Sequence, residues 1–62
     1  MREIELLKKL KEEKGLSYEK IARDLEVSFN TVYRWLAYNK PPRSMVMVNR
    51  IQDYLKRKGV KL

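Results

Sequence analysis

Apolar residues recur at helical spacing from the start of the chain. Ile4, Leu7 and Leu10 stand three residues apart with Glu and Lys between them, which predicts an amphipathic helix over residues 2–14. Gly15 follows directly, where the left-handed backbone that ends many helices favours glycine. The first helix is therefore expected to bury one face and to stop at Gly15.

Two shorter helices follow with almost no connection between them. Ser17 can cap a helix over residues 18–25 and Ser28 can cap one over residues 29–38, because a serine hydroxyl accepts a hydrogen bond from a free amide at a helix N-terminus. Helices this short and this close cannot lie antiparallel. They must cross at a large angle, roughly 90–120° in a helix-turn-helix.

The helix at 29–38 has two different faces. At about 100° of rotation per residue, Val32, Trp35 and Leu36 cluster on one side and form a core stripe. The opposite side combines aromatic rings with hydrogen-bonding groups and has no acidic residue; its members are Phe29, Asn30, Tyr33, Arg34 and Ala37. Aromatic rings left exposed beside such groups predict a binding face.

Three residues of this face also have plain structural interpretations. Phe29 can fold back onto the preceding helix as a core residue. Arg34 can pair with an acid such as Glu26, and Asn30 can serve only to help cap its own helix. The sequence leaves these alternatives open.

A fourth helix is predicted over residues 44–58. Pro41 and Pro42 end the third helix because proline disfavours helical geometry in the residue before it, while Ser44 is a candidate cap and Gly59 marks the end. The inner stripe consists of Val48, Ile51 and Leu55, with Met45 as a further candidate. The remaining apolar side chains of this helix are predicted to face outward: Val46, Met47 and Tyr54. The pattern predicts an all-α, compact four-helix domain that contains a helix-turn-helix, with residues 1–62 forming a single domain.

The charge is concentrated in the second part of the chain. Of 62 residues, 15 are Lys or Arg and 8 are Asp or Glu, which gives a net charge of +7. Residues 1–26 hold seven basic and seven acidic side chains, so the lysines of the first helix are interpreted as a balanced, solvated face. Residues 27–62 hold eight basic side chains against Asp53 alone. This asymmetry favours a polyanionic partner, either nucleic acid or an anionic membrane surface, with simple solubility as the alternative.

Composition also narrows the chemistry. The chain has no Cys and no His, which excludes disulfides, thiolate chemistry, zinc ligands of these types and histidine general bases. Without paired carboxylates in an obvious pocket or a glycine-rich phosphate loop, we expect no enzymatic activity, catalytic residue, metal, cofactor or small-molecule ligand. No apolar stretch approaches the roughly 20 residues of a membrane span, and the N-terminus lacks the apolar region of a signal peptide. We therefore expect no membrane contact and a cytoplasmic protein, nucleoid-associated or, if viral, in the host-cell cytoplasm.

The stretch from Lys11 to Trp35 resembles the Cro/phage-repressor type of helix-turn-helix DNA-binding domain. The positions that match the family pattern are Gly15, Leu16, Ser17, Ile21, Ala22, Leu25, Val27, Ser28, Thr31, Val32, Arg34 and Trp35. Pro42, Arg43 and Ser44 approximate the Pro-x-Ser that opens the next helix of the family. Glu26 stands where the family has a turn glycine, so either the turn accepts a side chain or its backbone differs.

The resemblance implies that the helix at 29–38 lies in the major groove of double-stranded DNA, with its N-terminal residues against base edges. It places base reading at Phe29, Asn30 and Arg34, with Tyr33 alongside. Arg suits guanine and Asn suits adenine, while Phe29 can contact a thymine methyl group or lie against the sugar-phosphate edge. Phosphate contacts are expected from the rims of the motif: Ser17, Tyr18, Ser28, Thr31, Tyr38, Lys40 and Arg43.

The resemblance also raises the question of a homodimer. Family members usually dimerise, which places two reading helices about 34–36 Å apart on a two-fold site. The apolar residues available for such a contact are Val46, Met47, Tyr54, Val60 and Leu62. Alternatively, Val60 and Leu62 fold back on the first helix of their own chain.

Together these features predict sequence-specific binding to double-stranded DNA by a repressor-like transcriptional regulator. The alternative from another class is a protein–protein interaction module that uses the exposed faces of the third and fourth helices.

Overall fold

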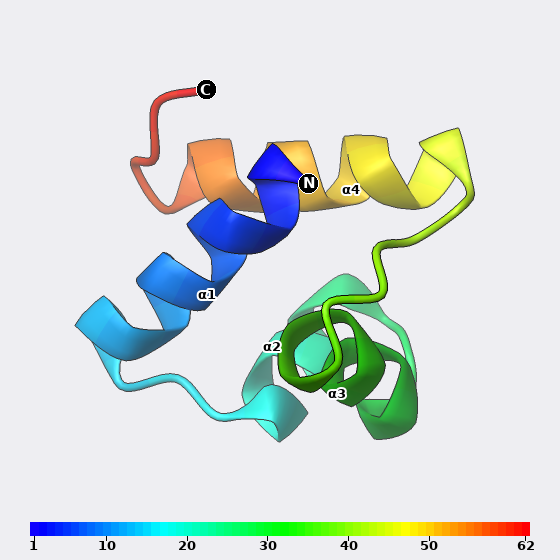
Figure 1. The fold of residues 1–62 in the computed structure, drawn as a ribbon. Helices are drawn as coiled ribbons and strands as arrows, with labels where there is room; N and C mark the ends of the chain where they lie inside the picture. The colour runs from blue at the N-terminus through cyan, green and yellow to red at the C-terminus, as the bar shows by residue number, and fades with distance from the viewer.

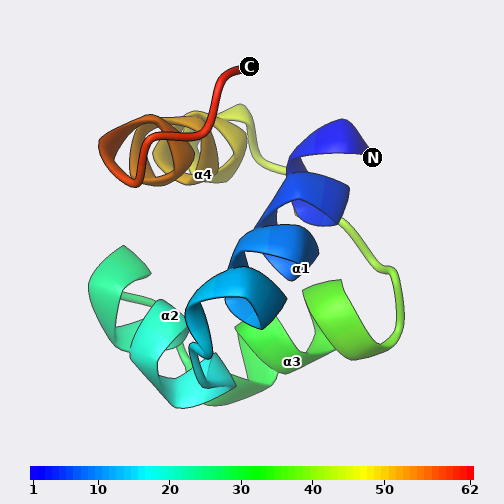
Figure 2. The same cartoon turned by 90° about the vertical axis from the view of Figure 1, so that its left-hand side faces the viewer.

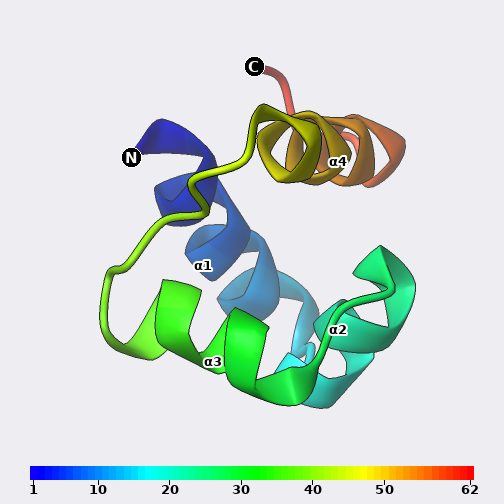
Figure 3. The same ribbon diagram turned by 90° about the vertical axis from the view of Figure 1, so that its right-hand side faces the viewer.

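The computed structural model describes residues 1–62, which form four α-helices and no strand. The helices are α1 (Arg2–Lys14), α2 (Tyr18–Leu25), α3 (Phe29–Ala37) and α4 (Met45–Arg57). Figure 1 shows α1 running diagonally between α4 above and the α2–α3 pair below, and Figures 2 and 3 show the same two levels from either side. The predicted all-α architecture with four helices is confirmed, and every helix end lies within one residue of its predicted position.

Local capping groups define where the helices begin and end. The hydroxyls of Ser17, Ser28 and Ser44 each accept a hydrogen bond from a backbone amide in the first turn, at 3.0 to 3.2 Å. A serine cap contributes about 1 kcal/mol to helix stability. Gly15 ends α1 in the left-handed conformation, with φ of 64°. Because these caps lie close in the chain to the helix ends, the ends could be predicted from the sequence.

One cluster of twelve buried side chains, drawn from all four helices, forms the core. Leu7, Ile21, Val32 and Ile51, one from each helix, are fully buried. α3 packs against α1 and α2, and α4 packs against the same two helices from the other level. The inner face of α3 is therefore fixed by α1 and α2, and its outer face is left free.

The turn between α2 and α3 is closed without glycine. Glu26 takes the left-handed conformation, with φ of 59° and ψ of 42°. Its amide donates a hydrogen bond to the carbonyl of Arg23 at 3.2 Å, and the amide of Val27 donates to the carbonyl of Ala22 at 2.9 Å. The backbone of the turn is therefore the one that favours glycine, and the turn accepts the side chain of Glu26 in that conformation.

The predicted outward position of Tyr54 is wrong. Only 2% of its surface is exposed, and it belongs to the core cluster. A tyrosine can be buried when its hydroxyl finds a partner, and here the hydroxyl donates to Oδ2 of Asp24 at 3.0 Å. Tyr54 is thus unavailable for the homodimer contact assigned to it.

Other apolar residues near the ends of α4 also differ from expectation. Met45 is 68% exposed and lies outside the inner stripe, because it begins α4 at the end that projects past α1 (Figure 1). Met47, predicted to face outward, is half-buried against the core. Val60 packs against the core and lines a hollow with Leu6 and Leu10 of α1, so this residue folds back on its own chain.

Candidate nucleic-acid interface

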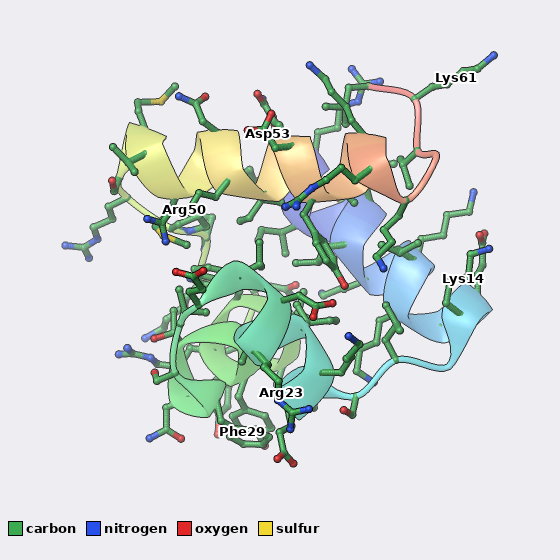
Figure 4. All side chains as sticks on the ribbon, turned by 180° about the vertical axis from the view of Figure 1, so that it is seen from behind. Lys14, Arg23, Phe29, Arg50, Asp53 and Lys61 are labelled. Carbon is green, nitrogen blue, oxygen red and sulfur yellow. The ribbon has the colours of Figure 1, made fainter.

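The outer face of α3 is exposed along its whole length. All five residues predicted for this face are exposed, including Phe29 at 48% and Tyr33 at 36%. Figure 4 shows the ring of Phe29 projecting on the side of the molecule opposite α4. Phe29 therefore does not fold back into the core, and α3 presents a ridge that another molecule can reach.

Four aromatic side chains run along this ridge, and we call them the aromatic row: Tyr18, Phe29, Tyr33 and Tyr38. Phe29 and Tyr33 stack with centroids 5.9 Å apart and ring planes at 12°. Tyr18, from α2, meets both rings edge-on, with centroid distances of 6.0 and 5.3 Å. Tyr38 meets Tyr33 edge-on at 5.5 Å. Each such pair contributes about 0.5–1.5 kcal/mol, so the rings hold one another in place.

Charged and polar side chains interact electrostatically with two rings of the aromatic row. The Nζ atom of Lys11 lies 4.5 Å from the centroid of Tyr18, which is a cation–π contact. Electrostatic interaction with the phenol of Tyr38 is the main cause that raises the pKa of Tyr33. A tyrosine with its ordinary pKa of 10.0 is already neutral at physiological pH, and the raised pKa of Tyr33 extends the pH range over which its hydroxyl stays a hydrogen-bond donor.

Polar side chains of the outer face have no partner within the chain. The two ion pairs of the protein, Lys20–Asp24 and Arg23–Glu19, both lie within α2. The Arg34 guanidinium takes part in neither of them, so it does not pair with Glu26. The side-chain amide of Asn30 is exposed and is absent from the capping hydrogen bonds of α3. Both groups are free to bind a ligand.

Three cations meet around one shallow hollow beside the C-terminal end of α3, which we call the basic hollow. It has a volume of about 320 Å³ and is lined by Arg34, Trp35, Lys40, Pro41, Pro42 and Arg43. The amide of Lys40 donates to the carbonyl of Arg34 at 3.3 Å, which brings the loop back towards the helix. No acid lines the basic hollow, and no acidic residue occurs between Glu26 and Asp53. This charge arrangement suits a phosphate group.

The loop that carries Lys40 also contacts α1. Asn39 adopts the left-handed conformation with φ of 54°, which asparagine tolerates better than most residues. The ammonium of Lys8 donates a hydrogen bond to Oδ1 of Asn39. Lys8 and Lys11 thus support the site, although sequence analysis placed both on a solvated face. The contact of Lys8 with Asn39 joins residues 31 positions apart, and that of Lys11 with Tyr18 joins α1 to α2; neither is marked by the helical periodicity of α1.

Hydroxyl groups assigned to phosphate binding also act as helix caps. Oγ of Ser28 accepts from the amide of Thr31 at 3.2 Å, and the two hydroxyls of this pair share a hydrogen bond of 2.7 Å. Oγ of Ser17 accepts from the amide of Lys20 at 3.0 Å. Since each hydroxyl carries one proton, Ser17 keeps its donor and the Ser28–Thr31 pair keeps one of two. The N-termini of α2 and α3 therefore retain donors for an anion.

The structure joins predicted site residues in the aromatic row and in the basic hollow, but it does not gather the predicted homodimer residues. Tyr54 is in the core, and Met47 and Val60 are half-buried. Val46 and Leu62 are exposed, yet they lie at opposite ends of α4.

Two short helices joined by a tight turn, with an exposed and acid-free second helix, define a helix-turn-helix domain. A family model described as a homeodomain-like domain matches residues 2–40, which include α1, α2 and α3. The chain belongs to this homeodomain-like family of helix-turn-helix DNA-binding domains. No curated protein and no solved structure matches the chain in the corresponding comparisons. None of the four helices has the length and apolar character needed to cross a membrane.

Proposed function

We propose that this protein binds double-stranded DNA sequence-specifically and regulates transcription as a repressor-like factor of the Cro/phage-repressor type. The outer face of α3 carries the proposal: it protrudes, has no acid, and presents Asn30 and Arg34 without partners beside exposed rings. The major groove of B-DNA is about 12 Å wide, and an α-helix with its side chains is about 10–12 Å across. α3 is accordingly the element that enters the groove.

Base reading rests on two side chains of complementary chemistry. Arg34 can donate two hydrogen bonds to O6 and N7 of guanine, and Asn30 can pair with N6 and N7 of adenine. Each good pair of this kind discriminates against a wrong base by about 1–3 kcal/mol. Phe29 and Tyr33 stand on the same face and complete the reading surface.

Phosphate binding is assigned to the basic hollow and to the two helix N-termini. Lys40 and Arg43 line the hollow, and we propose that they hold a phosphate beside the C-terminal end of α3. The remaining proposed phosphate contacts come from Ser17, Tyr18, Ser28, Thr31 and Tyr38. Arg34 lies both on the outer face of α3 and in the hollow, so either a base or a phosphate can be its target. We propose the base.

The test is a titration of the protein with several duplex sequences at a series of salt concentrations. Arg34→Ala is expected to reduce discrimination between sequences, because a base contact is lost. Lys40→Ala is expected to weaken binding to all duplexes alike. It should also make the negative slope of log K against log salt shallower by about 0.9, because one phosphate is no longer neutralised.

Lys56→Ala is the matched control, since it removes an exposed lysine of α4 on the far level of the molecule. It should leave both discrimination and salt slope close to those of the wild type. Equal, salt-insensitive affinity for duplex DNA and for a neutral polymer would overturn the proposal.

We also propose that the protein binds DNA as a homodimer. One module of this size buries only about 600–1,000 Å² on DNA, and a second copy doubles the contact. Met45 and Val46 are exposed apolar side chains at the start of α4 and are the best placed to meet a partner. Selection from random duplexes, combined with the mass of the complex in solution, distinguishes two half-sites and two copies from one.

The exposed faces of α3 and α4, the latter with Met45 and Val46, also support a second candidate function, a protein–protein interaction module. The salt titration separates the two candidates, because apolar protein contacts lack the steep salt dependence of phosphate binding.

A further inference from the structure

An uncharged hydrocarbon ring stands on the surface that we propose enters the major groove. Phe29 is 48% exposed although it has no polar atom that could gain from contact with water. Among the base edges of the major groove, the C5-methyl group of thymine is the apolar feature. We infer that Phe29, together with Tyr33, recognises thymine C5-methyl groups, so that the target is selected for thymine at the positions these rings meet. The inference rests on the proposed function, in which α3 enters the groove.

The ring of Phe29 is held in position before any ligand arrives. Tyr33 stacks on it with centroids 5.9 Å apart, and Tyr18 touches it edge-on at 6.0 Å. A side chain already held by its neighbours loses little conformational freedom on binding, which favours affinity and specificity. This support comes from α2 as well as α3, so the aromatic row acts as a rigid ridge.

The spacing of the two stacked rings is of the same order as the spacing of base pairs. Successive base pairs are about 3.4 Å apart along the duplex, so the centroid distance of 5.9 Å lies between one and two steps. Phe29 and Tyr33 can therefore meet methyl groups on neighbouring base pairs of one strand.

Asn30 points to the same kind of base pair. Its amide suits adenine, and every adenine of a duplex is paired with thymine. Asn30 adjoins Phe29 in the chain and shares the exposed face of α3. The preferences of the amide and of the ring thus converge on A·T pairs.

The test removes methyl groups from the DNA and leaves the protein unchanged. A duplex is first selected from a random library by the wild-type protein and then synthesised again with deoxyuridine in place of thymidine. Uracil pairs with adenine as thymine does and lacks only the methyl group. Burying one methyl group corresponds to about 0.8 kcal/mol, or about a fourfold change in affinity. We expect the wild type to bind the uracil duplex about fourfold more weakly for each methyl group contacted.

Three variants assign the effect to residues. Phe29→Ala should lose the part of the thymine preference that its ring supplies, and the double variant Phe29→Ala/Tyr33→Ala should bind the thymine and uracil duplexes with affinities within about twofold of each other. Both rings are exposed, so the core stays intact. Asn30→Ala is the matched control: it should bind both duplexes more weakly and keep the ratio between them.

The outcomes separate this inference from the proposed function. If the wild type binds the two duplexes equally well, the inference is overturned and duplex binding still stands. A full thymine preference that survives in Phe29→Ala/Tyr33→Ala overturns it as well, since the methyl groups would then be recognised elsewhere. Tighter binding to the isolated single strand overturns it too, because the rings would then stack on bases. Failure to bind any duplex overturns the proposed function itself.

Discussion

The hydroxyl of Tyr54 donates a hydrogen bond to Oδ2 of Asp24 over 3.0 Å and thereby joins α4 to α2. The other carboxylate oxygen of Asp24 accepts from the ammonium of Lys20 at 2.8 Å. The hydrogen bond from Lys20 is the main cause that lowers the pKa of Asp24, and the bond from Tyr54 acts in the same direction. Burial, followed by the hydrogen bond to Asp24, raises the pKa of Tyr54 to about 12.

The substitution Tyr54→Phe tests the strength of this link. The ring stays in the core and only the hydroxyl is lost, so the free energy of unfolding should fall by about 1 kcal/mol, as is typical of one hydrogen bond. Urea unfolding at pH 7 measures the change. Tyr38→Phe, which removes a hydroxyl from an exposed ring, should leave the midpoint unchanged. A loss in both variants, or in neither, would contradict the prediction.

The same hydroxyl predicts a loss of stability at high pH. The pKa of Tyr54 is raised to about 12 in the folded protein, above the value of about 10 for an unfolded tyrosine. Its contribution to stability is therefore complete below pH 10 and is lost as the pH rises towards 12. Between these values, the free energy of unfolding of the wild type should fall more steeply than that of Tyr54→Phe. Thermal unfolding at half-unit pH intervals provides the measurement, and parallel curves would refute the prediction.

The left-handed backbone at Glu26 predicts that glycine is better in the turn. Glu26→Gly should raise the free energy of unfolding by about 0.5–1 kcal/mol, because glycine adopts a φ of 59° without steric cost. Glu12→Gly is the matched control, since the same change inside α1 should lower stability by about the same amount. Denaturant unfolding of both variants decides the matter, and a change of the same sign in the two would contradict the argument.

Substitutions at Ser28 can separate its role as a helix cap from its proposed role in DNA binding. Ser28→Asp should keep the stability of the wild type, because aspartate caps a helix as well as serine does. Its carboxylate should nevertheless weaken duplex binding about tenfold at low salt, since under the proposed function it would face the phosphates at the N-terminus of α3. Ser28→Ala should lose about 1 kcal/mol of stability and weaken duplex binding less than Ser28→Asp does, because it removes one proposed phosphate donor without adding a negative charge. Unfolding and binding curves for both variants provide the measurement, and an equal loss of stability or an equal loss of affinity in the two would contradict the prediction.

The parts of the fold that follow local rules were predictable from the sequence. Ile4, Leu7 and Leu10 repeat at helical spacing, and the serine caps lie within three residues of the amides they bind. The same periodicity placed Phe29 and Arg34 on the side of α3 opposite Trp35 and Leu36, but it left open whether Phe29 folds back onto the preceding helix; the structure shows Phe29 exposed.

Features that depend on distant partners were not predictable. Tyr54 can be buried because Asp24, thirty positions earlier, accepts a hydrogen bond from its hydroxyl. The meeting of Arg34, Lys40 and Arg43 in the basic hollow depends on the path of the loop between α3 and α4. Along that path Lys8 contacts Asn39, 31 positions later in the chain, and the sequence pattern does not predict this contact.

The two chain ends differ in their distance from the ridge of α3. The C-terminus lies beside α4, on the opposite level from the aromatic row (Figures 1 and 2). Met1 instead lines a hollow with Asn39 and Pro41, next to Lys40. A fluorescent dye or a fusion partner attached after Leu62 would therefore leave the reading surface open, whereas the same group placed before Met1 would crowd the loop that carries Lys40.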